Sequence, residues 1–213
     1  DRERGVASSI SPRPWQTDTC IGVWHYHKKL YDEDGYTTPK FVVDMLVDIV
    51  SCNGNLMLNI PLPNDGMPDD KEMKVIDGIT RWMAVNSEGI YGTRPYRIPG
   101  DGPVAPPPAA GVKFNESARK DLTAQHVRYT TKGETLYAFV MGWPEQGEKK
   151  QAVIPALATG DGPDPGRVQN VELLGYGGKL NWKQEAKGLS IELPDEKPSE
   201  HAVTFKIAGA KTA

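Results

Sequence analysis

The feature that most constrains the fold is the run over residues 38–96, which alternates between helical and strand patterns. Thr38 is a good N-cap, and Pro39 suits the first helical position, where its missing N–H is not needed. We expect this helix to end at Asn53-Gly54, with Gly54 in the left-handed conformation that glycine tolerates. Its apolar residues recur at helical spacing: Val42, Met45, Leu46, Ile49 and Val50.

A short strand and a second helix follow. Residues 55–60 carry leucine or isoleucine at every second position, as in a strand between two packed layers. The second helix begins at Asp69 or Asp70, and its largely apolar stripe comprises Met73, Ile76, Ile79, Thr80 and Met83. A helix–strand–helix order is typical of an α/β fold with parallel strands. The polar loop after the strand lies where the active sites of (β/α)8 barrels are found.

The N-terminal part is less regular. Residues 1–14 are charged, then serine-rich, then proline-rich, which indicates a loop. Residues 17–26 are rich in β-branched and aromatic side chains and are predicted to form a strand. Residues 28–36 are polar, and Asp34-Gly35 indicates a turn.

The composition changes at residues 99–111, which contain five prolines and three glycines. Such a stretch cannot sustain a helix or a central strand, because proline lacks the backbone N–H. We therefore expect a linker here, between an N-terminal unit of residues 1–98 and a C-terminal unit of residues 112–213.

The C-terminal unit has the period of two that strands show. Residues 126–131 and 135–143 are predicted to pair as a hairpin across 132–134, and Tyr137, Phe139 and Met141 form one face of the second strand. Regularly spaced strands with turns between them are typical of an antiparallel β-sandwich. The further predicted strands are residues 151–157, 168–174, 180–185, 188–193 and 202–207.

Charge and cysteine content exclude several classes of protein. The net charge of −3 and the pI near 5.9 give no reason to expect nucleic acid or an anionic membrane surface as a partner. No apolar run is long enough to span a bilayer. Cys20 and Cys52 are too few for a disulfide scaffold and lack the spacing of a metal site, so we expect two free, buried thiols.

Three separated motifs resemble one known family. They are PWQTDTCIG at residues 14–22, LVDIVSCNGNLMLNI at 46–60 and IYGTRPY at 90–96, and in this order they resemble the retaining α-L-fucosidases of glycoside hydrolase family 29. The resemblance is strong over residues 1–96. A (β/α)8 barrel takes roughly 250 residues, so residues 1–98 cannot close one. The resemblance implies a C-terminal fragment of such a barrel followed by an antiparallel β-sandwich.

The family's chemistry gives roles to a few residues. Retaining glycosidases use two carboxyl groups, one as nucleophile and one as acid/base. The resemblance places the nucleophilic Asp upstream of this chain and makes Glu3 the candidate acid/base, a solvated surface Glu being the alternative. It also implies that Trp24 stacks on the sugar, with Trp15 and His25 as further substrate-binding candidates. No cofactor or metal is expected.

A second function remains open from the sequence. The β-sandwich could be a non-catalytic carbohydrate-binding fragment, with a binding face made of aromatic side chains, although aromatics at alternating strand positions are more often core. These aromatics are Tyr129, Tyr137, Trp143, Tyr176 and Trp182. In the fucosidase interpretation the partners are a fucosylated glycan and the missing N-terminal barrel portion. We expect export to the periplasm, the medium or the lysosome, although the chain itself contains no signal peptide.

Overall fold

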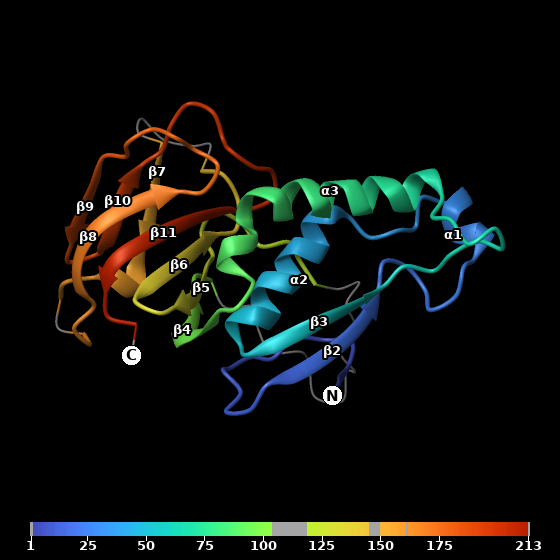
Figure 1. Cartoon of the computed structure of the whole chain (residues 1–213), viewed down its shortest axis with the longest axis horizontal. Coiled ribbons are helices and arrows are strands. Elements are labelled where there is room, and N and C mark those ends of the chain that lie inside the picture. The colour runs from blue at the N-terminus through green and yellow to red at the C-terminus, as the bar shows by residue number, and fades with distance from the viewer. Residues whose placement is uncertain (1, 104–118, 145–149, 161, 213) are drawn as a thin grey trace.

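The computed structural model describes residues 2–103, 119–144, 150–160 and 162–212, arranged as four layers (Figure 1). The layers are a parallel sheet, a pair of helices, a five-stranded antiparallel sheet and a three-stranded antiparallel sheet. In the N-terminal part the elements are β1 (Arg2–Glu3), β2 (Trp15–Cys20), α1 (Lys28–Asp32), α2 (Pro39–Ser51), β3 (Gly54–Asn59), α3 (Asp70–Asn86) and the 3-10 turn η1 (Ser87–Gly89).

In the parallel sheet, β2 pairs with both β1 and β3. Glu3, Asp18 and Met57 lie in register across the three strands, so their side chains share one face. The other face, with the buried Thr17 and Thr19 of β2, turns toward the helices. The strand predicted over residues 17–26 is thus shorter than expected, because the chain bends after Cys20.

The two main helices start as predicted. The Thr38 hydroxyl accepts a hydrogen bond from the Phe41 N–H at 3.1 Å, with Pro39 at the first helical position of α2. Asp69, one of the two predicted alternatives, caps α3 in a reciprocal pair with Glu72. The five-residue helix α1 was not predicted, because its polar sequence indicates a turn equally well.

The end of α2 corrects one prediction. The left-handed residue is Asn53, with φ of 69°, and not Gly54. Gly54 instead begins β3, and glycine is needed there because a Cβ would lie 2.6 Å from the ring of Trp15. Asparagine tolerates the left-handed region better than most residues do, since its short side chain can hydrogen-bond locally.

The C-terminal part is antiparallel, as predicted. β4 (Arg94–Asp101), β5 (Val127–Lys132), β6 (Thr135–Val140), β11 (Val203–Ala210) and β8 (Gly166–Leu173) form one sheet in this order. The second sheet consists of β7 (Gln151–Ile154), β10 (Gly188–Glu192) and β9 (Trp182–Glu185), with the turn η3 (Pro155–Leu157) after β7. The hairpin of β5 and β6 turns at Gly133-Glu134, within the predicted turn.

Strand β4 was not predicted, because its prolines and glycines led us to place residues 99–101 in the linker. It pairs with β5 through Arg94–Thr131 and Asp101–Val127, so the antiparallel sheet begins before that linker. The rest of the linker from residue 104 lies outside the described residues, and so does Asn115-Glu116-Ser117, which has the pattern of an N-glycosylation sequon.

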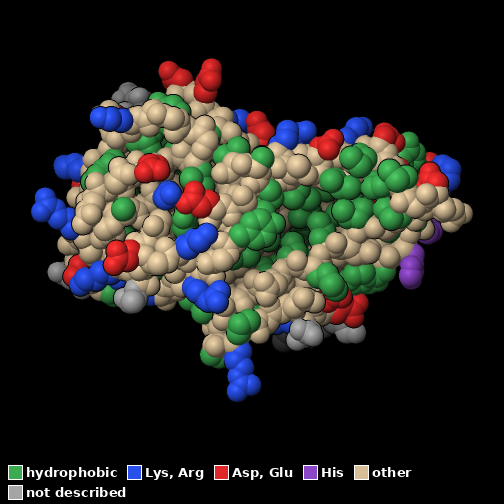
Figure 2. All heavy atoms as spheres, in the orientation of Figure 1, with side chains coloured by type: hydrophobic (Ala, Val, Ile, Leu, Met, Phe, Trp, Pro, Cys, Tyr) green, Lys and Arg blue, Asp and Glu red, His purple; other side chains and the backbone are tan. Residues whose placement is uncertain are grey.

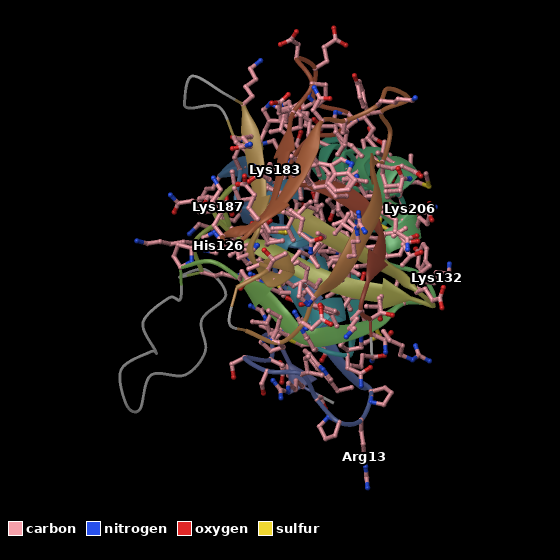
Figure 3. All side chains as sticks on the ribbon, turned by 90° about the vertical axis from the view of Figure 1, so that its left-hand side faces the viewer. Arg13, His126, Lys132, Lys183, Lys187 and Lys206 are labelled. Carbon is pink, nitrogen blue, oxygen red and sulfur yellow. The ribbon has the colours of Figure 1, made fainter. Side chains whose placement is uncertain are left out.

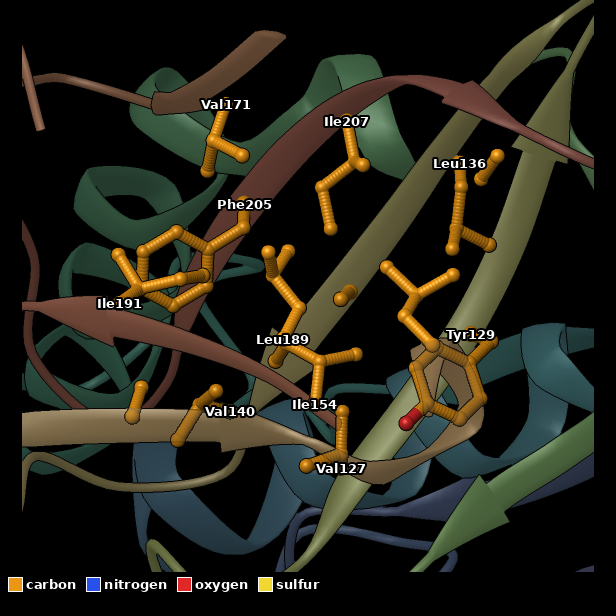
Figure 4. Close-up of a cluster of buried hydrophobic side chains, with 14 of the residues drawn as sticks. Val127, Tyr129, Leu136, Val140, Ile154, Val171, Leu189, Ile191, Phe205 and Ile207 are labelled. Carbon is orange, nitrogen blue, oxygen red and sulfur yellow. The ribbon is translucent and has the colours of Figure 1, made fainter. Parts of the chain in front are cut away.

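The two antiparallel sheets share one apolar core (Figure 4). Val127, Leu136 and Phe205 from the larger sheet meet Ile154 and Ile191 from the smaller one, and all five are at most 2% exposed. Burial of this cluster holds the two sheets together.

The helices pack on the opposite face of the larger sheet. The predicted face of Tyr137, Phe139 and Met141 meets α2 and α3, where Trp82 is 1% exposed. Polar contacts fix the same junction. The Trp82 indole donates to the Ala202 carbonyl at 2.9 Å. On α2, the buried Asp48 pairs with Arg119 and Arg128.

Candidate active site

The carboxyl ends of the three parallel strands meet at one edge of their sheet. β1 ends at Glu3, β2 at Cys20 and β3 at Asn59. The segment after β2 bends back over this edge and carries Trp24 and His25. Three of the four predicted site residues therefore come from segments that converge here.

Glu3 is exposed, on the face of the parallel sheet that no described helix covers. The pairing of β1 with β2 continues one residue past Glu3, where the Arg4 N–H donates to the Asp18 carbonyl at 2.8 Å. Both arginines that flank Glu3 lie on tryptophan rings. The Arg2 guanidinium carbon is 4.7 Å from the Trp15 ring centre, and that of Arg4 is 5.2 Å from the Trp24 ring centre.

Trp24 is half-buried and held at two points. Its carbonyl accepts a hydrogen bond from the Asn59 side chain at 3.2 Å, which ties the bend to the end of β3. Its ring lies beside the Arg4 guanidinium, which is a favourable cation–π geometry. His25, the next residue, is exposed. Asn59, the last residue of β3, thus anchors the Trp24 backbone.

Trp15 is not brought to this edge, contrary to the expectation that it shapes the same pocket. It begins β2, opposite Gly54, and its indole donates to the Cys52 carbonyl at 2.9 Å. A six-residue strand is about 16 Å long at roughly 3.3 Å per residue, which separates Trp15 from the carboxyl end. The motif PWQTDTCIG spans the whole strand, so proximity in sequence was misleading.

Arg4 and Cys20 lie at the same edge of the sheet and are candidate site residues that the sequence analysis did not name. The Arg4 guanidinium donates to the Cys20 sulfur at 3.1 Å, and the Cys20 thiol donates to the Gly22 carbonyl at 3.0 Å. They line a cavity of about 160 Å³ together with Thr37. The prediction that Cys20 and Cys52 are free and buried is confirmed.

A larger groove, of about 310 Å³, lies at the amino end of β3, away from this edge. Leu46 and Val50 of α2, Leu56 of β3 and Met83 of α3 line it on one side. Residues 90–95, from the third family-like motif, line the other, and Tyr91 there is 67% exposed. Figure 2 shows apolar side chains gathered over α2 and α3, in a hollow on this face of the molecule.

Other kinds of site find little support in the described residues. None of the described His, Cys, Asp and Glu side chains form a group of three or more that could hold a metal ion. The labelled basic side chains of the antiparallel part, such as Lys132, Lys183 and Lys206, spread over the surface without forming one patch (Figure 3). Lys183 pairs with Glu185, and Lys206 with Glu88.

The aromatic residues of the antiparallel sheets are mostly core. Tyr129 and Tyr137 are at most 2% exposed, and their hydroxyls donate to Asp101 and Glu88 at 2.6 and 2.7 Å. Trp143 and Trp182 pack against the core between the sheets. The core interpretation of these aromatics is confirmed for Tyr129 and Tyr137, so these two rings are not available to a binding face.

Active sites of (β/α)8 barrels lie at the carboxyl ends of the strands, and an aromatic ring at that edge offers an apolar surface on which a sugar can pack. Comparison with known proteins makes this specific. The family model for α-L-fucosidase matches residues 1–88, and the model for the α-L-fucosidase C-terminal domain matches residues 119–208. The chain belongs to this family, the α-L-fucosidases of glycoside hydrolase family 29.

Individual relatives agree. The human tissue α-L-fucosidase is 28% identical over 210 residues, which cover 95% of this chain and 39% of that protein. The human plasma α-L-fucosidase is 29% identical, over 87% of this chain and 34% of that protein. An α-L-fucosidase structure superposes with a TM-score of 0.70 at 22% identity, covering 95% of this chain and 40% of that one.

The structure of the Thermotoga maritima α-fucosidase in complex with fucose gives a TM-score of 0.68 at 20% identity, covering 93% of this chain and 41% of that one. The chain thus spans about two fifths of the length of the relatives that it matches. None of the helices in the described part of the chain is long and apolar enough to cross a membrane.

Proposed function

We propose that this chain is the C-terminal part of a retaining α-L-fucosidase, which hydrolyses terminal α-L-fucosyl residues of glycans through a covalent fucosyl-enzyme. The observation that carries the proposal is the convergence of Glu3 and Trp24 at the carboxyl edge of the parallel strands, in a chain of the fucosidase family. The nucleophilic Asp would come from the upstream part of the same polypeptide.

In this proposal β1, β2 and β3 are the last strands of a (β/α)8-type barrel. Parallel strands with helices on one face, and Glu3, Asp18 and Met57 on the other, fit a barrel segment whose inner face is that of Glu3. No described strand pairs with the outer edge of β3, so the sheet can be extended there. The two antiparallel sheets would be the C-terminal β-sandwich.

Each site residue then has a defined task. Glu3 gives its proton to the leaving oxygen in the first step and takes a proton from water in the second. Trp24 offers a ring to the apolar face of the sugar, and His25, exposed beside it, can hydrogen-bond a sugar hydroxyl. Trp15 has no role at the site, because it lies at the far end of β2.

The fucosidase proposal is favoured over a non-catalytic carbohydrate-binding fragment, because Tyr129 and Tyr137 are buried and Trp143 and Trp182 pack against the core, which leaves Tyr176 as the exposed ring of the five. We also propose export of the full-length protein, by analogy with relatives named for plasma.

The test uses the full-length polypeptide with Glu3→Ala. Turnover of fucosides with poor leaving groups should fall by about 10²–10⁴-fold, because they need the proton from Glu3. An activated aryl fucoside should lose much less. Added azide should restore part of the turnover and yield α-fucosyl azide, since azide attacks the covalent intermediate without needing a general base.

The matched control is Glu134→Ala, which removes an exposed Glu from the turn between β5 and β6. It should leave kcat and KM unchanged. If Glu3→Ala slows all substrates equally and azide has no effect, Glu3 is not the acid/base. If the unmodified full-length polypeptide does not release fucose, the proposed function is wrong.

A further inference from the structure

We propose that Arg4 is a positioning residue that holds the acid/base Glu3 and the sugar-stacking Trp24 in register with each other. The inference rests on the proposed function, and it concerns a residue to which the fucosidase assignment gives no role. Its basis is that one side chain contacts both the bend that carries Trp24 and the strand next to Glu3.

The backbone at Arg4 is unusual. Its φ of 57° lies in the left-handed region, which a residue with a Cβ rarely adopts, and Gly5 follows with φ of 108°. Strained backbone of this kind persists only where the surrounding contacts enforce it, and it is concentrated at functional sites. Here the Arg4 N–H is fixed to the Asp18 carbonyl, so the chain turns sharply one residue after Glu3.

Two contacts of the Arg4 side chain matter here, and they differ in kind. The guanidinium donates to the Cys20 sulfur at the end of β2, and it lies 5.2 Å from the centre of the Trp24 ring. The Cys20 thiol is fixed in turn by its bond to the Gly22 carbonyl. Arg4 thus has an anchor on β2 and an aromatic ring to position.

Arginine suits this task better than lysine. A planar guanidinium can stack on a ring while its N–H groups donate in the ring's neighbourhood, whereas an ammonium acts as a point charge. Arg2 provides the internal comparison, since it also flanks Glu3 and lies on a tryptophan ring. Its ring is that of Trp15, at the far end of β2, so Arg2 should not affect the site.

The consequence for catalysis follows from the geometry. Glu3 must reach the leaving oxygen while Trp24 holds the sugar ring, and small displacements of either group cost rate. Without the Arg4 contacts, the bond of its carbonyl to Asn59 still holds the Trp24 backbone, but the ring loses the guanidinium beside it. Arg4 variants should therefore weaken fucose binding and impair the proton transfer at once.

The experiment compares Arg4→Lys, Arg4→Gln and Arg2→Gln in the full-length polypeptide. For Arg4→Lys, the affinity for free fucose should fall about tenfold. The loss of kcat/KM should be several-fold larger for alkyl fucosides than for an activated aryl fucoside. Arg4→Gln should show the same pattern more strongly, and Arg2→Gln should retain unmodified values.

A double-mutant cycle with Trp24→Leu separates positioning from general destabilisation. If Arg4 acts through the Trp24 ring, Arg4→Lys should cost little further fucose affinity once the ring is gone. Two outcomes would overturn the Arg4 assignment alone, provided that the enzyme is active and azide rescues its Glu3→Ala form. One is additive losses in the cycle, and the other is equal effects of the Arg4 and Arg2 variants. An unmodified polypeptide without fucosidase activity would overturn the proposed function and Arg4's role with it.

Discussion

Asp44, on α2, is a completely buried carboxyl group. It pairs with Lys40 and accepts a hydrogen bond from the Leu122 N–H. Burial disfavours the charged form and raises the pKa of Asp44 from its ordinary value of 3.8 to about 6, although Lys40 and the Leu122 N–H oppose the shift. The folded chain therefore holds a proton on Asp44 at pH values where the unfolded chain has lost it.

This predicts a pH dependence of stability with a definite sign. Between about pH 4 and 6 the folded state binds more protons at Asp44, so its contribution to the free energy of unfolding grows as the pH falls. We expect Asp44→Asn to lose this part of the pH slope. Urea unfolding at pH 7.5, 6.0 and 4.5 measures it, as the difference between variant and unmodified chain.

Asp77→Asn, an exposed position on α3, is the control and should give a curve parallel to that of the unmodified chain. A parallel curve for Asp44→Asn as well would mean that the pKa of Asp44 is not raised. The measurement compares the variant with the unmodified chain, because other carboxyl groups also affect the pH dependence of stability. Lysine partners lower the pKa values of Glu88, Asp164 and Glu185, so these groups contribute with the opposite sign.

Local features could be predicted from the sequence where one side chain hydrogen-bonds to the backbone of residues close to it in the chain. Thr38 and Asp69 cap their helices because each side chain reaches an N–H two or three residues ahead. Gly54 was misassigned because its need for glycine comes from the ring of Trp15, which sits on another strand. The left-handed Arg4 could not be predicted at all, since its partners Cys20 and Trp24 are 16 and 20 residues away in the chain.

At the scale of elements, the helix pair is the centre of the molecule. α2 and α3 contact the parallel sheet through Val42 and Val75, and the five-stranded sheet through Val43 and Trp82. The two sheets are thus connected through one helical layer, visible in Figure 1. We expect this layer to couple their stability.

Trp82→Ala tests the coupling. Loss of this buried side chain should cost about 3–5 kcal/mol, and it removes the indole bond to Ala202. Native-state hydrogen exchange should then speed up in α3 and also in β6 and β11, because the ring packs on Phe139. Trp182→Ala, on the outer sheet, should leave α3 protected, and faster exchange confined to α3 in Trp82→Ala would disprove the coupling.

Elements were predictable in proportion to how strictly they follow one period. α2, α3 and the hairpin of β5 and β6 are regular and were found. β4 contains Pro95, Pro99 and Gly100, and its pairing with β5 is irregular between Pro95 and Gly100. The irregular pairing accommodates proline and glycine, which fit poorly into a regular ladder of hydrogen bonds. A prediction based on the regular period of two therefore did not identify β4.

At the scale of the whole molecule, the family and the antiparallel character of the C-terminal half were both available from sequence. The first depended on three motifs in order, and the second on a period of two. The sequence did not show which residues lie close together in space, as Trp15 and Trp24 illustrate. Their positions depend on strand direction and on bends, which motif matching does not resolve.

The groove lined by Leu46, Val50, Leu56 and Met83 gives the last prediction. Beside it runs the outer edge of β3, with which no described strand pairs. If the upstream part of a fucosidase barrel adds a strand and a helix here, the groove becomes buried core. Leu46→Gln should then have a small effect on stability in one polypeptide and a large effect in another.

In the 213-residue chain, where Leu46 is partly exposed, the substitution should change the free energy of unfolding by less than about 1 kcal/mol and reduce binding of a hydrophobic dye. In the full-length polypeptide it should cost at least about 2 kcal/mol, because a polar amide replaces a buried leucine. Tyr176→Gln, at an exposed apolar position in the antiparallel part, should be mild in both. A Leu46→Gln effect that is equally small in both polypeptides would show that the upstream segment leaves this groove open to solvent, and the barrel arrangement proposed for β1, β2 and β3 would then have to be abandoned.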